Sequence, residues 1–147
     1  MPLPRSGLRP PDFRRPVAFV LPGGAAWGAV QVGMLEALTA AGVVPDLLVC
    51  TSVGALNAAL VAGRPADEAG EAVAELRAAW TSTRRRHVFP LDGRAVGRAL
   101  RRHGHLLTND ALRAWIGARL RFTRLEDAAI PLHVMATDVA AHRPVVL

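Results

Sequence analysis

The stretch LLVCTSVGALNAAL, residues 47–60, contains a short apolar run, a small polar corner and a second apolar run with helical spacing. A similar junction occurs earlier, in VLPGGAAWGAVQVGML, residues 20–35, where Pro-Gly-Gly separates the two runs. Short apolar runs bounded by turn residues are typical of buried strands, and longer runs that end at glycine are typical of helices. The two stretches therefore predict the order strand, helix, strand, helix.

The same patterns extend along most of the chain, and alternating strands and helices imply a parallel sheet. The expected strands are residues 17–21, 47–50, 131–138 and 143–147. The expected helices are residues 28–41, 53–62, 67–80 and 109–120, the last capped by Thr108 or Asn109 and facing the core with Leu112, Trp115, Ile116 and Leu120.

Composition fits one globular domain. The chain has 147 residues, 51% of them hydrophobic, which is enough to bury a core. Residues 1–16 are rich in Pro and Arg and are expected to form a flexible lead, with a single domain over residues 17–147. The uncharged residues 16–35 and 47–63 could suggest membrane spans, but buried elements of a sheet explain them better.

The charged residues and the cysteine exclude some chemistry. The formal net charge is +6 and every basic residue is Arg, so a lysine nucleophile is excluded. The single cysteine, Cys50, excludes an internal disulfide and fits a reducing compartment. We therefore expect a cytoplasmic protein, and peripheral contact with a membrane is an open alternative.

The loop GGAAWG, residues 23–28, joins an expected strand to a helix N-terminus. Small residues there allow close approach of a ligand, and the backbone N–H groups and the helix dipole favour negative charge. The loop could bind a phosphate or an oxyanion, or it could be only a tight turn. The dinucleotide fingerprint fits poorly, because Ala25 replaces its middle glycine and no acidic residue ends the second strand.

The second corner, Cys50-Thr51-Ser52-Val53-Gly54, is a G-x-S-x-G nucleophile elbow whose first glycine is replaced. A sharp turn from strand to helix exposes the serine hydroxyl, and small neighbours prevent collisions. A serine that only caps the helix is the alternative. The strand before it, the helix after it and the glycine loop upstream favour Ser52 as a nucleophile.

Loop and elbow together resemble the patatin-like phospholipases. Residues 23–28 are similar to that family's G-G-G-x-R-G loop, residues 51–54 match its elbow, and GALNAAL resembles the helix that follows. ATDVAAHRPVVL resembles a later pair of family strands, so the likeness runs from Val17 to the end. The resemblance implies a three-layer α/β fold with a mostly parallel central sheet flanked by helices.

The resemblance also implies a serine lipid acyl hydrolase, a carboxylic ester hydrolase that uses a Ser–Asp dyad and needs neither cofactor nor metal. Ser52 would attack the acyl carbonyl of a lipid ester, and backbone N–H groups around Gly24 and Ala25 would bind the oxyanion. Gly23 and Gly28 would complete this oxyanion loop. The family's aspartate lies after the later strands, so we expect it beyond Leu147 and expect this chain to be the N-terminal portion of the domain.

Three residues depart from the family pattern. Ala25 adds a methyl group to the loop, Trp27 replaces a basic residue, and Cys50 takes the place of a glycine that lets strand and helix pack closely. Asp92-Gly93 is the only Asp-Gly pair, but it precedes the later strands and is expected to be a turn.

Other catalytic arrangements fit less well. Ser52, Asp138 and His142 have the chain order of an α/β-hydrolase triad, but the last two lie only four residues apart, and Asp138 is interpreted as structural. His133 lies in an apolar strand and is expected to be a core or edge histidine. His103 and His105 could bind a metal, but no cysteine or acidic cluster completes the site.

Two arginine patches follow the third expected helix, at residues 84–87 and at Arg98, Arg101 and Arg102. They are expected to be solvated surface, with contact to anionic lipid head groups as the functional alternative. Nucleic acid is disfavoured, because aromatic residues make up only 5% of the chain. A catalytically silent patatin-like module that binds lipid or a partner remains the alternative to an enzyme.

Overall fold

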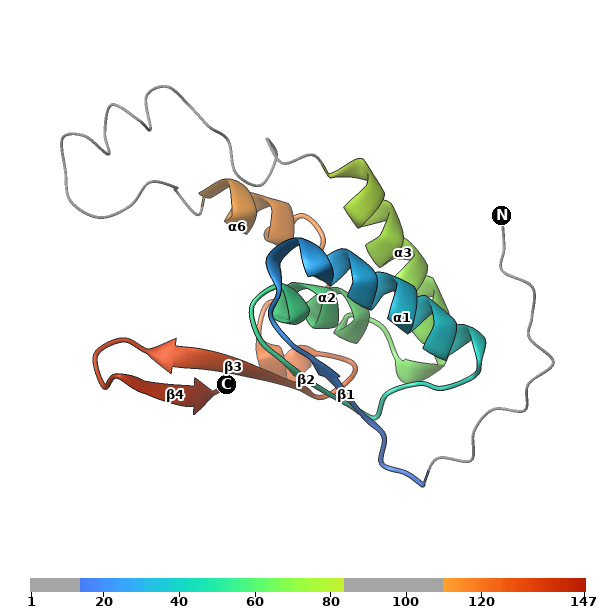
Figure 1. Ribbon diagram of the computed structural model, residues 1–147, viewed down its shortest axis with the longest axis horizontal. Helices are drawn as coiled ribbons and strands as arrows, with labels where there is room; N and C mark the ends of the chain where they lie inside the picture. The colour runs from blue at the N-terminus through green and yellow to red at the C-terminus, as the bar shows by residue number, and fades with distance from the viewer. Residues whose placement is uncertain (1–13, 84–109) are drawn as a thin grey trace.

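A four-stranded, mostly parallel sheet organises the protein (Figure 1). The computed structural model describes residues 14–83 and 110–147. The strand order is β1-β2-β3-β4, with β1, β2 and β3 parallel and β4 antiparallel to β3. The strands are β1 (Ala18–Leu21), β2 (Leu47–Cys50), β3 (Leu132–Asp138) and β4 (Arg143–Val146). The predicted α/β fold with a mostly parallel sheet is confirmed.

The helices follow the predicted order. They are α1 (Gly28–Ala40), α2 (Val53–Ala62), α3 (Ala69–Ser82) and α6 (Asp110–Gly117), with single 3-10 turns η1 (Ala25–Trp27), η2 (Ala66–Glu68) and η3 (Leu125–Asp127). The bounds of α2 agree with the prediction at both ends. The last helix ends at Gly117 and not at Leu120, because glycine favours helix ends. Its expected caps, Thr108 and Asn109, lie outside the described residues.

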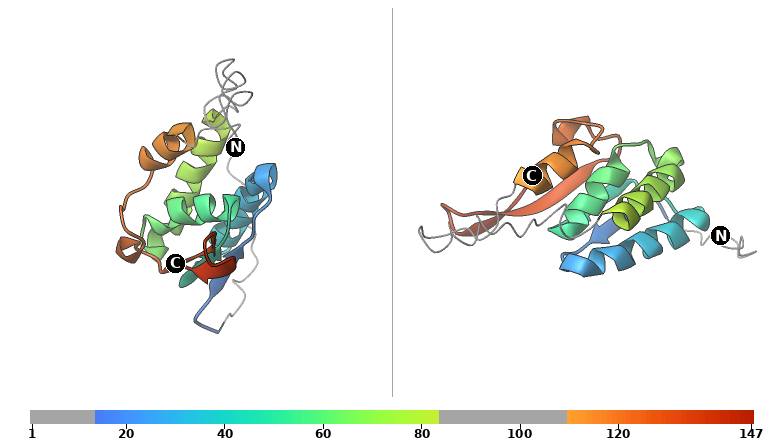
Figure 2. Two further views of the ribbon diagram at one scale, coloured as in Figure 1. Left: turned by 90° about the vertical axis from the view of Figure 1, so that its left-hand side faces the viewer. Right: turned by 90° about the horizontal axis from the view of Figure 1, so that it is seen from above.

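Helices cover one face of the sheet. Figures 1 and 2 show α1, α2 and α3 on the same side of the strands. In β1, Phe19 and Leu21 are buried on that side, whereas Ala18 and Val20 alternate with them and are exposed. The described residues therefore form the sheet and one layer of helices, which are two of the three expected layers.

The hydrophobic core lies between the sheet and these helices. Four of these elements and the segment before β3 each contribute a side chain that is no more than 2% exposed: Leu35 from α1, Leu48 from β2, Val61 from α2, Leu76 from α3 and Ile130 just before β3. Burial of one such side chain stabilises the fold by about 1.5–3 kcal/mol. This packing fixes the positions of the loops at the carboxyl ends of β1 and β2.

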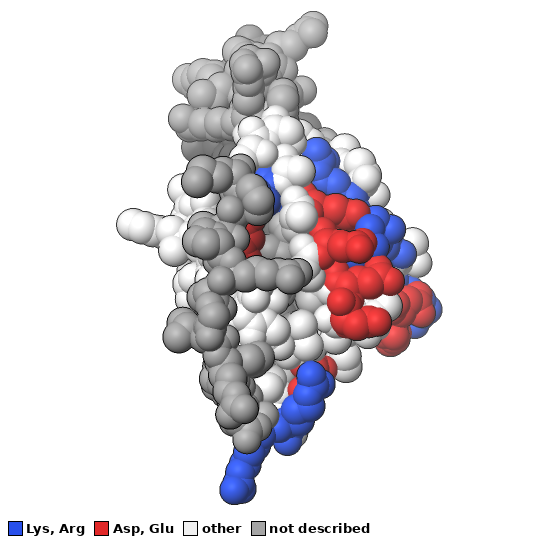
Figure 3. Space-filling model, turned by 90° about the vertical axis from the view of Figure 1, so that its right-hand side faces the viewer, with Lys and Arg blue, Asp and Glu red and all other residues white. Residues whose placement is uncertain are grey.

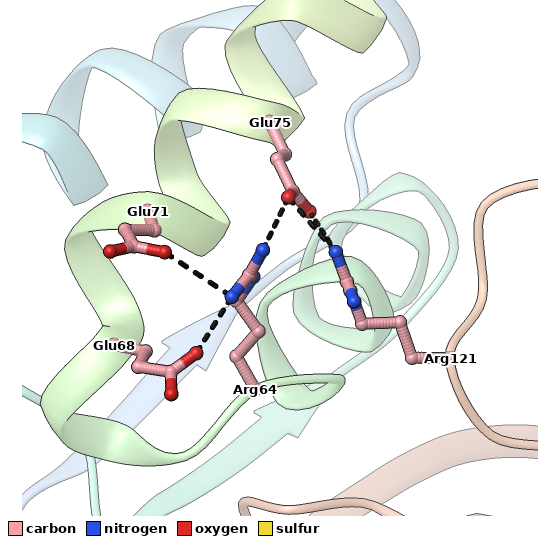
Figure 4. Close-up of polar contacts among 5 residues, drawn as sticks. All are labelled: Arg64, Glu68, Glu71, Glu75 and Arg121. Carbon is pink, nitrogen blue, oxygen red and sulfur yellow. Dashed lines mark hydrogen bonds and ion pairs between the residues drawn. The ribbon is translucent and has the colours of Figure 1, made fainter.

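A cluster of opposite charges joins the loop after α2, η2, α3 and the segment after α6 (Figure 4). The guanidinium of Arg64 contacts Glu68 at 2.7 Å, Glu71 at 3.3 Å and Glu75 at 2.6 Å. Arg121 adds a 2.9 Å contact to Glu75. The hydrogen bond from Arg64, reinforced by Arg121, holds the pKa of the Glu75 carboxyl below its ordinary value. The cluster fastens segments that are distant in the sequence.

Charges on one side of the molecule are mixed in sign. Figure 3 shows Asp and Glu side chains gathered in one patch with Arg side chains beside them. The arginine patches at residues 84–87 and 98–102 lie outside the described residues. Their contact with anionic lipid therefore stays a prediction.

Candidate functional site

Ser52 occupies the corner between β2 and α2, as predicted. It is the N-cap residue of α2, with φ 53° and ψ −126°, and its side chain makes no capping hydrogen bond. Positive φ is strained for a residue with a Cβ, and such strain persists where the surrounding structure imposes it. The turn leaves Ser52 exposed. This is the geometry of a nucleophile elbow and not that of an ordinary capping serine.

Gly54 permits the close contact that forms this corner. A Cβ at this position would lie 2.0 Å from the carbonyl oxygen of Leu21 and 2.7 Å from that of Pro22. The first turn of α2 therefore presses directly on the backbone at the end of β1. Only glycine allows this approach, which agrees with the prediction that the elbow needs small neighbours.

The glycine loop lies against the elbow, so the two corners found in the sequence meet in space. A Cβ on Gly23 would lie 3.1 Å from Cβ of Ser52 and 3.7 Å from its Oγ. Gly28 is buried, and a Cβ there would lie 2.4 Å from Val53 and 2.7 Å from the Trp80 ring. The loop is thus packed against both Ser52 and the helix that follows it.

Two of the departures in the loop have structural consequences. Ala25 has φ 48°, a left-handed conformation that glycine adopts more easily, so the replacement adds strain rather than bulk alone. The Trp27 side chain is 74% exposed, and the backbone N–H of this residue, like that of any residue here, donates to the carbonyl oxygen of Gly24 at 2.9 Å. The bond closes the single turn η1 and shapes the loop between the two glycines.

Thr51 and Cys50 fasten the elbow to the neighbouring strands. The N–H of Thr51 donates to Leu21 O at 3.2 Å, and its hydroxyl donates to Met135 O at 3.2 Å. The thiol of Cys50 donates to His133 O at 3.4 Å and is only 2% exposed. Burial raises the pKa of this thiol to about 11. Cys50 is therefore a neutral packing residue.

We expect Cys50 to resist alkylation in the folded protein. A pKa near 11 instead of 9.0 lowers the thiolate fraction at pH 8 by about 10²-fold, and burial also blocks access. Mass spectrometry after timed exposure to iodoacetamide measures the reaction, with protein unfolded in urea as the control. Rapid stoichiometric alkylation without urea would contradict the assignment.

A largely buried polar network behind the glycine loop was not predicted from the sequence. It consists of Gln31 from α1, Asn57 from α2 and Trp80 from α3, and it contacts the loop through main-chain carbonyl oxygens. Gln31 is 8% exposed and Asn57 is 1% exposed. The signal was present, because these two amides interrupt the otherwise apolar, uncharged residues 28–35 and 53–63.

The alternative triad gains no support from the geometry. Oδ1 of Asp138 accepts hydrogen bonds from the N–H groups of Ala140 and Ala141, both at 3.0 Å, so it shapes the β3–β4 turn. His142 is exposed at the end of that turn, with φ 50°. Within residues 14–83 and 110–147, no side chain hydrogen-bonds to the hydroxyl of Ser52. Asp138 is thus structural, as expected.

Only some of the histidines named in the sequence lie among the described residues. His133 was expected in the core or at a sheet edge; the core alternative is wrong, because His133 alternates with the buried Leu132 on β3 and is exposed. His103, His105 and Asp92 lie outside the described residues. Among the residues that the structure describes, no group of three His, Cys, Asp or Glu side chains could hold a metal ion.

The protein is thus an α/β protein in which a strained, exposed serine lies at a sharp turn between a parallel strand and a helix, as at a nucleophile elbow. The sequence model of the patatin-like phospholipases matches residues 19–146, and the chain belongs to this family. A stretch of 53 residues is 51% identical to lysophospholipase nte1 of Aspergillus terreus (strain NIH 2624 / FGSC A1156). That stretch covers 36% of this chain and 3% of the length of that relative. None of the described helices is long and apolar enough to span a bilayer.

Proposed function

We propose that this chain carries the nucleophile and the oxyanion loop of a serine lipid acyl hydrolase. Membership of the patatin-like phospholipase family and similarity to a lysophospholipase support lipid acyl hydrolysis in general. The observation that carries the finer proposal is the strained Ser52, exposed at the elbow with the glycine loop in contact with it. Strain of this kind is concentrated at active sites.

In the proposed reaction, Oγ of Ser52 attacks the acyl carbonyl carbon of a lipid ester, and a base takes the hydroxyl proton. The carbonyl oxygen becomes an oxyanion, stabilised by N–H groups of Gly24 and Ala25 and by the N-terminus of α2. The tetrahedral intermediate then expels the alcohol, which takes up the proton, and leaves an acyl-serine that water hydrolyses. The proposed base is an aspartate outside the described residues, as the family resemblance implies.

We also propose that the protein is cytoplasmic and makes peripheral contact with a membrane. A cytoplasmic enzyme with lipid ester substrates would meet them at a membrane surface. The arginine patches at residues 84–87 and 98–102 would then contact anionic head groups, each nearby Arg contributing on the order of 1 kcal/mol.

Release of fatty acid from lysophosphatidylcholine micelles tests the proposal. We expect multiple turnovers when these residues are joined to the aspartate that the family resemblance implies, because water hydrolyses the acyl-serine and restores the free serine. Residues 1–147 without that base should show no turnover at an enzymatic rate. Fatty acid is measured by mass spectrometry, with heat-treated protein as the control. Binding to lipid vesicles without any hydrolysis of lipid or p-nitrophenyl esters would favour the silent binding module instead.

A further inference from the structure

We propose that Asn57 is a positioning residue that holds the glycine loop against Ser52 through a buried relay of Gln31, Asn57 and Trp80. The inference rests on the proposed function for its catalytic consequence, but the relay itself is a feature of the fold. Both amide side chains are almost fully buried, and Trp80 is half-buried at one end of the relay.

The direction of every hydrogen bond in the relay follows from Trp80. An indole N–H can only donate, so the atom 2.8 Å from Nε1 of Trp80 is the amide oxygen of Asn57. Nδ2 of Asn57 must then face acceptors, which are Gly28 O at 3.0 Å and Gln31 Oε1 at 2.8 Å. Nε2 of Gln31 in turn donates to Pro22 O at 2.7 Å. The hydrogen bonds of the relay therefore allow only one orientation of the Asn57 amide and one of the Gln31 amide.

The relay ends on the two sides of the glycine loop. Pro22 immediately precedes the loop, and Gly28 is its last residue. Asn57 lies on α2, five residues after Ser52 at the N-cap of that helix. A single side chain therefore ties both ends of the loop, directly or through Gln31, to the helix that carries the serine.

Packing alone does not account for polar groups at these positions. The neighbouring buried residues of α2, Ala58 and Val61, are apolar, whereas Asn57 is buried among polar partners. Amides need partners when they are buried, and the partners of Asn57 lie on two other helices, Gly28 and Gln31 on α1 and Trp80 on α3. The relay therefore specifies the distance between loop and serine, on which oxyanion stabilisation depends.

The main test compares Asn57→Leu with the wild-type protein in hydrolysis of p-nitrophenyl butyrate. A loop that is displaced by about 1 Å loses transition-state contacts, so we expect kcat to fall by up to about 10²-fold while KM changes less than about twofold. Gln31→Met, which removes the bonds to Pro22 and to Asn57 but keeps those of Asn57 with Gly28 and Trp80, should give a smaller loss of kcat. Val61→Ala, one turn further along α2, is the control for lost stability and should lower Tm with little change in kcat.

Hydrogen exchange separates failure of this inference from failure of the proposed function. In Asn57→Leu, or in Gln31→Met if the first variant does not fold, the amides of residues 23–28 should exchange faster than in the wild type. Unchanged exchange, or an unchanged kcat in a folded Asn57→Leu variant, would overturn the relay. If the wild type hydrolyses no ester but the variant shows faster exchange, the relay stands and the proposed function falls.

Discussion

Replacing Ser52 by alanine should abolish covalent labelling by a fluorophosphonate and reduce ester hydrolysis to background. The phosphonate reacts with an activated serine hydroxyl, and no other described serine lies at an elbow. Loss of the nucleophile in triad hydrolases lowers kcat on the order of 10⁶-fold, and we expect a loss of that class here. Labelling is read by mass spectrometry of the modified peptide.

The matched control is Ser82→Ala at the end of α3. Its hydroxyl only donates to Ala79 O at 3.2 Å, so labelling should be unchanged. The strain at Ser52 offers a second measurement. Ser52→Gly should unfold at a higher temperature than the wild type, because glycine tolerates positive φ. Equal labelling of the wild type and Ser52→Ala would refute the assignment of the nucleophile.

Replacing Gly54 by alanine should have the largest effect on stability. The added methyl group would lie 2.0 Å from Leu21 O and 2.6 Å from Leu21 C, which are backbone atoms and cannot rotate away. The N-terminal turn of α2 must shift, which separates the elbow from β1. We expect the free energy of unfolding to fall by about 3 kcal/mol or more, together with loss of fluorophosphonate labelling. Urea denaturation followed by circular dichroism measures the first effect.

Gly33→Ala is the matched control for this substitution. Gly33 is exposed in the interior of α1, and a Cβ there would meet nothing within 4 Å. Alanine should therefore stabilise the protein by about 0.5–1 kcal/mol, because it loses less backbone entropy in a helix. If Gly54→Ala proved as stable as the wild type, the close contact between α2 and β1 would be wrong.

Local signals predicted the elements of the first half of the chain. The apolar run before Pro22 became β1, and α2 began and ended where its flanking Ser52 and Gly63 indicated. Such signals act over a few residues, through turn propensity, capping and apolar spacing, so they are readable without tertiary contacts. They also identified the elbow, because its strand, turn and helix are contiguous in the sequence.

The sequence by itself thus determined the order of strands and helices, the corner at Ser52 and the glycine loop. Only the tertiary structure decided what these corners contact. β4 pairs antiparallel with β3, and the thiol of Cys50 donates a hydrogen bond to β3. Asn57 forms hydrogen bonds with residues that lie 23 to 29 positions away in the sequence. A buried amide or thiol takes whichever donors and acceptors packing brings near, and that packing depends on every layer at once.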